Sequence, residues 1–227
     1  METFGTVLSK RAIQILKDHE YDGMSISCVK SFLYDMLEPA PDRGDMLYRY
    51  EHSIRAAENA AVIAEAEGLP TDDLIIACLL HDVGYRECGD DFIRHQFYSA
   101  DIANLYLKNV GYPPDSLQEM VKGIALHNLT DKLPEDMTVF QMSVRDCDDI
   151  DRFDMIRTSM ILGNCVNGKT NKEIIVSCNH AVDIANWTMS LRRGTRTAQN
   201  MINKNCQKRI TLLQDIIAQA RKGFRYE

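Results

Sequence analysis

Long apolar runs are missing from this 227-residue sequence. No stretch approaches the ~20 residues that a helix needs to cross a bilayer. A signal peptide is not indicated either, because neither an apolar core nor a small-residue cleavage site is found in the opening residues, METFGTVLSKRAIQILKDHE. We therefore expect a cytoplasmic protein without a membrane partner.

Paired cysteine motifs and phosphate-binding loops are also missing. The seven cysteines are scattered, and no C-x-x-C pair occurs, so neither a zinc finger nor a thioredoxin-like dithiol is supported. We interpret them as reduced thiols in or near the core. The sequence has no Walker lysine, glycine-rich loop or dinucleotide fingerprint, which leaves those phosphate chemistries without support.

Strand-like alternation of apolar and polar residues is rare, whereas apolar spacings of three and four recur along the chain. This pattern predicts an all-α fold. Thr71 and Thr170 are expected to cap helices at their N-termini, and Gly84 is expected to end the helix that Thr71 begins. The other helices are expected over residues 6–20, 25–38, 45–67, 95–110, 114–128, 144–153, 171–192 and 196–221.

Charge is unevenly distributed. The net charge of −7 argues against a general nucleic-acid binder, yet residues 192–225 hold nine Lys or Arg against one acid, Asp215. A basic helix can meet RNA, an acidic protein or a membrane surface, but such a run is most often a solvated face. The long C-terminal helix is also compatible with a homodimer.

Four histidines fall between residues 52 and 127, each on or at the end of an expected helix. His81 and Asp82 stand together in the segment LLHDVG, where an apolar helix ends. Ionisable side chains are costly in a core unless they are paired or bind a metal. Neighbours on a helix point about 100° apart, so both side chains can reach one ion. The alternative is a helix-terminal histidine beside a solvated aspartate.

Five separated motifs weigh against that alternative. They are EHSIR (51–55), LLHDVGY (79–85), HQFYSADIA (95–103), GIALHN (123–128) and RDCDDIDRF (145–153). In this order they resemble the HD-domain superfamily of metal-dependent phosphohydrolases, over about residues 45–160. The resemblance implies a helical bundle as a metal-binding core at 45–165. Residues 1–40 would be an N-terminal helical extension and 170–227 C-terminal helices, all within one structural domain.

The resemblance also implies a ligand set. The four core ligands fall on His52, His81, Asp82 and Asp148. The choice of Asp148 follows the family's A-D-x-L pattern, matched here by Cys147-Asp148-Asp149-Ile150. The neighbouring acids, Asp146, Asp149 and Asp151, would then lie around the site or face solvent.

His95 and His127 match the family's ligands for a second ion. His95 opens an H-x-x-x-[SG]-A helix, and His127 ends an I-x-x-H helix. Asp82 would bridge the two ions. The competing interpretation is a single ion, with these two histidines contacting phosphate or capping helices.

Imidazole and carboxylate ligands suit Mn, Fe, Ni, Co or Zn, so one or two such divalent ions are expected. A bound ion lowers the pKa of its water toward neutrality, and Asp82 is accordingly assigned a catalytic role. Arg55, three residues after His52, lies on the same helical face and could bind phosphate, or it could pair with Glu51 or Glu58 on the surface.

The expected function is metal-dependent hydrolysis of a phosphomonoester or phosphodiester, with a nucleotide or small phosphometabolite as substrate. Two alternatives stay open. Some members of the superfamily hold two irons and act as oxygenases, for which His95 and His127 would be needed. A helical sensor or adaptor without turnover is the other.

Overall fold

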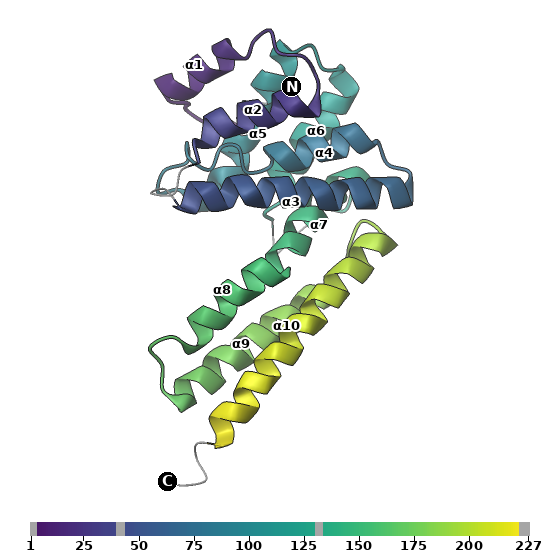
Figure 1. Cartoon of the computed structure of the whole chain (residues 1–227). Coiled ribbons are helices and arrows are strands. Elements are labelled where there is room, and N and C mark those ends of the chain that lie inside the picture. The colour runs from purple at the N-terminus through teal and green to yellow at the C-terminus, as the bar shows by residue number, and fades with distance from the viewer. Residues whose placement is uncertain (1–3, 40–43, 130–133, 223–227) are drawn as a thin grey trace. The chain divides into compact units, whose positions relative to one another are not determined.

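The computed structural model describes residues 4–39, 44–129 and 134–222 (Figure 1). This part of the chain forms ten α-helices and one short 3-10 helix, with no strand, so the predicted all-α fold is confirmed. The chain divides into two compact units, Met1–Asp148 and Asp149–Glu227. The domain limits expected from the sequence stay a prediction.

The first unit is built from seven α-helices, the last of which runs on into the second unit. The 3-10 helix η1 covers Phe92–Arg94. The α-helices are α1 (Lys10–Asp18), α2 (Ile26–Leu37), α3 (Gly44–Glu67), α4 (Thr71–Leu80), α5 (His95–Asn109), α6 (Pro114–Leu126) and α7 (Val139–Arg152).

Helix α4 is the centre of this unit. Six of its residues are buried, and it packs against α2, α3, α5 and α6. Burial on every side follows from its sequence, because the stretch LIIACLL has no polar face. The residues that directly follow α4, His81 and Asp82, are therefore carried into the interior, where each is only 1% exposed.

Gly84 allows the chain that leaves α4 to pass close to α5. Its amide donates a hydrogen bond to the Ser99 hydroxyl at 3.0 Å. A Cβ at residue 84 would lie 2.4 Å from the backbone nitrogen of Ser99. Only glycine fits this approach, which sets the distance between the turn carrying Asp82 and the helix carrying His95.

The second unit contains α8 (Met155–Val166), α9 (Asn171–Ser190) and α10 (Arg196–Lys222). Thr170 caps α9 in a capping box with Glu173, as expected from the sequence. Helices α9 and α10 lie side by side as a hairpin (Figure 1). A hydrophobic cluster that joins this hairpin to α8 holds Cys165, Cys178, Leu213 and Ile217.

Several local predictions were wrong. Helix α4 begins at Thr71 itself and ends at Leu80, so Pro70 takes the cap position and the chain turns before Gly84. Proline fixes φ near its helical value and needs no amide partner, which lets it occupy this place. Helix α7 starts at Val139 rather than 144, and α8 was not predicted. Asp154 caps α8 only two residues after α7 ends, so no loop-like segment separates them.

None of the helices in the described ranges is long and apolar enough to span a membrane. All seven cysteines are free thiols, and six of them are buried.

Candidate metal centre

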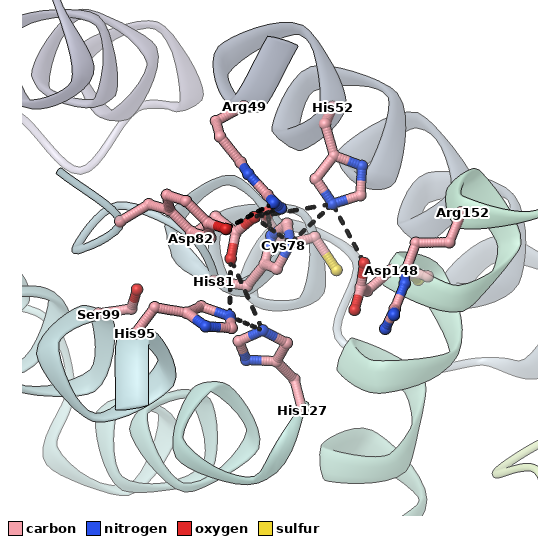
Figure 2. Close-up of polar contacts among 12 residues, drawn as sticks. Arg49, His52, Cys78, His81, Asp82, His95, Ser99, His127, Asp148 and Arg152 are labelled. Carbon is pink, nitrogen blue, oxygen red and sulfur yellow. Dashed lines mark hydrogen bonds and ion pairs between the residues drawn. The ribbon is translucent and has the colours of Figure 1, made fainter. Parts of the chain in front are cut away.

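The carboxylate of Asp82 lies among four histidine side chains, and both of its oxygens face imidazole nitrogens (Figure 2). Oδ1 lies 3.2 Å from Nε2 of His95 and 3.7 Å from Nε2 of His127. Oδ2 lies 3.9 Å from Nε2 of His52 and 3.7 Å from Nε2 of His81. All five side chains are buried. One carboxylate thus faces two pairs of imidazoles.

Asp148 joins the first of these pairs. Its Oδ1 lies 3.1 Å from Nε2 of His52, which in turn lies 3.1 Å from Nε2 of His81. The ligand atoms of these three residues all lie within 4.8 Å of one another, and the same holds for His81, Asp82 and His127. His95 approaches His127 with 3.2 Å between their Nε2 atoms. His81 belongs to both of these groups, and His95 lies beside Asp82 and His127, so the structure brings the six predicted ligands close together.

Helix ends supply most of these side chains. His81 and Asp82 directly follow α4, His95 is the first residue of α5, and His127 directly follows α6. Asp148 lies in the C-terminal part of α7. His52, in contrast, comes from within the long helix α3. Five different helices thus meet at the centre.

Backbone carbonyls fix the orientation of three imidazoles. Nδ1 of each donates a hydrogen bond to the carbonyl three residues earlier in the chain. The distances are 2.6 Å from His81 to Cys78, 2.6 Å from His95 to Phe92 and 2.7 Å from His127 to Ile124. A proton on Nδ1 leaves the lone pair of a neutral imidazole on Nε2, which is the atom that faces the centre.

The surroundings of His81, His127 and Asp82 favour the protonation states that a metal ion requires, whereas Asp82 outweighs burial at His95 and raises the pKa of that imidazole. Burial, together with the charge of His81, lowers the pKa of His127 to about 3. Burial also lowers the pKa of His81. For Asp82, burial would raise the pKa, but His81, Arg49 and His95 outweigh it and hold the pKa well below its usual range. Neutral imidazoles and an ionised carboxylate are the forms that bind a cation.

The residues fit a divalent cation on their own evidence. Asp82 Oδ1 is buried and makes no hydrogen bond within the described ranges. Leaving a buried carboxylate oxygen without a donor costs free energy, as does placing two imidazole lone pairs 3.2 Å apart at His95 and His127. A cation between these groups would remove both costs, and nitrogen and oxygen ligands of this kind suit first-row divalent metals.

Arg49 is a residue of this centre that the sequence reasoning missed. Its Nη1 donates to Asp82 Oδ2 at 2.9 Å, and its Nη2 donates to the Tyr85 hydroxyl at 2.8 Å. The guanidinium also lies 3.8 Å from the centroid of the Tyr85 ring. Burial lowers the pKa of Arg49, but the charge of Asp82 outweighs this and raises it. The sequence feature that could have identified Arg49 is its position three residues before His52, on the same helical face.

The remaining candidates lie as follows. Arg55, predicted to bind phosphate, places its guanidinium 6.0 Å from the centroid of the Tyr48 ring. Among the acids beside Asp148, Asp149 accepts a hydrogen bond from Arg193 at 2.5 Å. Asp146 and Asp151 are both buried.

Comparisons with known proteins agree with this geometry. Residues 49–156 match the family model of the HD domain. A crystal structure of a predicted HD superfamily hydrolase from an uncultured Thermotogales bacterium is similar, with a TM-score of 0.61 and 18% sequence identity. The similarity covers 86% of this chain and 92% of that one, and at this identity it shows the fold. No curated protein matches the sequence.

HD domains bind divalent metal ions, and the two groups of buried histidine and aspartate ligands lie inside the matched segment. Residues 49–156 are therefore similar to an HD domain, and this match supports a metal-dependent hydrolase family.

Proposed function

We propose that this protein hydrolyses phosphate esters with two divalent ions held by six side chains. The observation that carries the proposal is the arrangement around Asp82, whose two oxygens each face two imidazole nitrogens. One ion would be held by His52, His81, Asp148 and Oδ2 of Asp82. The other would be held by His95, His127 and Oδ1 of Asp82.

Divalent ions in such a centre make water a nucleophile near neutral pH and neutralise charge on phosphoryl oxygens. The protein residues contribute orientation and exclusion of water. The carbonyl-bound imidazoles of His81, His95 and His127 keep Nε2 directed inward before any ion arrives. Burial of all six side chains lowers the local dielectric constant, which strengthens every charge interaction there.

Arg49 is the better candidate for binding the phosphate. In the structure its guanidinium neutralises Asp82 Oδ2, an atom that a bound ion would take over. Tyr85 would then keep the guanidinium at the centre, through its hydroxyl and the face of its ring. A guanidinium beside the ions favours an anionic substrate with several oxygens, as phosphate esters are. Arg55, on the other side of His52, stays the second candidate.

The substrate class that follows is a phosphomonoester or phosphodiester, with a nucleotide or small phosphometabolite as the first choice. The metal would be Mn, Fe, Co, Ni or Zn, because the ligands are imidazoles and carboxylates.

The test combines metal content with a substrate screen. The wild-type protein, purified without chelators, is measured beside Asp82→Asn, His127→Ala and the control His180→Ala, whose side chain is exposed on α9. We expect about two ions per chain in the wild type and control, fewer in both site variants, and matching losses of phosphate release. The screen covers nitrophenyl phosphates, nucleotides and cyclic dinucleotides.

Two results would count against the proposal. Wild-type protein that takes up no transition metal, even after soaking, would remove the metal centre. Protein that holds two irons and consumes oxygen with an organic substrate, while releasing no phosphate from any ester, would instead assign the oxygenase chemistry known elsewhere in the superfamily.

A further inference from the structure

The C-terminal end of α7 has a partner for each of its last four carbonyls. A helix leaves these groups without intrahelical donors. The amides of Phe153 and Asp154 donate to the carbonyls of Asp149 and Asp151, at 3.1 and 3.0 Å. Side chains from α10 serve the other two: Asn205 donates to Ile150 O at 3.2 Å, and Arg209 donates to Arg152 O at 2.5 Å. The last turn of α7 is thus capped in part by a distant segment.

Arg209 makes the most extensive of these contacts. Its side chain is almost fully buried in the second unit, although it is charged. Besides Arg152 O, it donates from Nε to the Thr158 hydroxyl at 3.0 Å, and its guanidinium lies 4.2 Å from the centroid of the Phe153 ring. Burying a guanidinium costs free energy unless its N–H groups donate hydrogen bonds. The contacts of Arg209 therefore fix the position of its side chain. It connects α10 to the end of α7 and to the first turns of α8.

Arg193 adds a second connection to the same turn. Its Nη1 donates to Asp149 Oδ2 at 2.5 Å, and its Nη2 donates to Thr188 O at 2.8 Å, near the end of α9. The Arg193 side chain is 1% exposed. Asp149 directly follows Asp148, so two buried arginines hold the segment that begins one residue after a proposed metal ligand.

We propose that Asn205 and Arg209 are positioning residues for Asp148. In an α-helix the carbonyl of residue 148 is bonded to the amide of residue 152, so the conformation of Asp148 depends on the last turn of α7 remaining helical. Helix ends fray when their terminal carbonyls lose partners. Fraying by one turn would release Asp148 from its place 3.1 Å from His52 Nε2.

This inference rests on the proposed function in one respect, namely that Asp148 is a metal ligand. It also gives the C-terminal helices, which lie largely beyond the matched HD segment, a role in the chemistry. The competing explanation is that these contacts only stabilise the second unit. The two explanations differ in whether metal affinity changes in protein that is still folded.

The experiment compares Arg209→Met and Asn205→Ala with Lys208→Met, the exposed neighbour on α10. Full-length, metal-free protein is titrated with Mn²⁺, and folding is checked by circular dichroism. We expect affinity for one ion to fall about tenfold or more in the first two variants, the usual effect of losing a group that orients a ligand. Lys208→Met should keep wild-type affinity.

A double-mutant cycle with Asp148→Asn decides between the explanations. If Arg209 acts through Asp148, Arg209→Met should cause no further loss of affinity in the Asp148→Asn background. Folded Arg209→Met with wild-type affinity, or an equal loss in both backgrounds, would overturn the inference. Should Arg209→Met fail to fold, Asn205→Ala carries the same cycle, because it removes one neutral hydrogen bond only.

Amide hydrogen exchange separates this inference from the proposed function. In metal-free protein, the substitutions at 205 and 209 should speed exchange of the amides at residues 151 and 152, while amides near the start of α7 keep their rates. If the wild type binds no ion but the substitutions still speed exchange, the proposed metal chemistry is refuted and the positioning of Asp148 is retained. Unchanged exchange would refute the positioning, whatever the metal does.

Discussion

Replacing Asp82 by asparagine keeps the shape of the side chain and removes its negative charge. Asp82 Oδ1 faces His95 and His127, while Oδ2 faces His52 and His81. Both proposed ions therefore lose a charged ligand in one substitution. The amide oxygen of asparagine is a weaker metal ligand than a carboxylate oxygen, and the amide brings no negative charge to either cation. The affinity of both sites should therefore fall together.

The size of the effect can be worked from binding linkage. An ion present at 100 times its dissociation constant stabilises the folded state by about 2.7 kcal/mol, and two independent sites give roughly 5.4 kcal/mol. A domain of this size shifts its Tm by roughly 2–4 °C for each kcal/mol, which predicts a metal-induced increase of about 10–20 °C in the wild type. If both dissociation constants rise about a hundredfold in Asp82→Asn, the increase falls to roughly 2–3 °C.

The assay is thermal unfolding of each variant with and without Mn²⁺. Only the difference between the two scans is compared, which cancels the effect of the substitution on metal-free protein, including the loss of the Arg49 partner. His127→Ala should retain about half of the wild-type shift, because the group around His52 stays intact. His180→Ala should retain all of it. A full wild-type shift in Asp82→Asn would refute the reasoning, since the stabilising ions would then bind elsewhere.

Three further predictions concern single residues. Arg49→Met should lower kcat/KM for phosphate esters by roughly tenfold or more, because a charged hydrogen bond to the substrate is lost. Its metal content, measured by elemental analysis, should stay unchanged. A larger loss in the matched variant Arg55→Met would assign phosphate binding to Arg55 instead. Gly84→Ala should destabilise the protein by about 1–3 kcal/mol in urea unfolding, because its Cβ meets the backbone of α5, and it should disturb the position of His95. The control Gly163→Ala, with nothing within 4 Å of the added atom, should be neutral or stabilising. Burial lowers the pKa of His19, but two aspartates outweigh it and raise the pKa above its ordinary 6.5. The stability that His19 contributes is therefore complete below pH 6.5 and declines as pH rises through the raised pKa. The difference in unfolding free energy between wild type and His19→Gln should shrink as pH rises. A difference that grows with pH would contradict the raised pKa.

The fold class and the membership of the site were accessible from sequence because both depend on local patterns. Apolar spacings of three and four predict helices wherever they occur, and the all-α fold is confirmed. The histidines stand in short motifs at helix ends, and the structure brings all four to Asp82. Their roles as ligands stay a prediction until metal is measured.

Arg49 shows where local patterns fail. It lies three residues before His52, and Arg55 lies three residues after it, so both share one helical face. The choice between them depends on which end of α3 is nearer to the turn after α4. That is a matter of packing between helices, and periodicity within α3 carries no information about it.

Asp149 is a second residue whose position local patterns do not decide. Four acids within six residues looked equivalent from sequence, and only a family pattern selected Asp148. In the structure Asp149 accepts a hydrogen bond from Arg193, which is 44 residues away in the chain. Pairings of this length depend on how α9 and α10 return to the end of α7, so helical periodicity alone could not have distinguished the two acids.

The centre also explains why its ligands stand where they do along the helices. Carbonyls in the last turn of a helix lack intrahelical donors, and Cys78 and Ile124 belong to the last turns of α4 and α6. Their carbonyls accept hydrogen bonds from Nδ1 of His81 and His127, so the same contact satisfies a helix end and orients a ligand. Helix C-termini also carry partial negative charge, which stabilises cations. A histidine placed directly after the last turn of a helix therefore gains a fixed tautomer and a favourable field for a metal ion. The sequence motif and the chemistry coincide at these two positions for that reason.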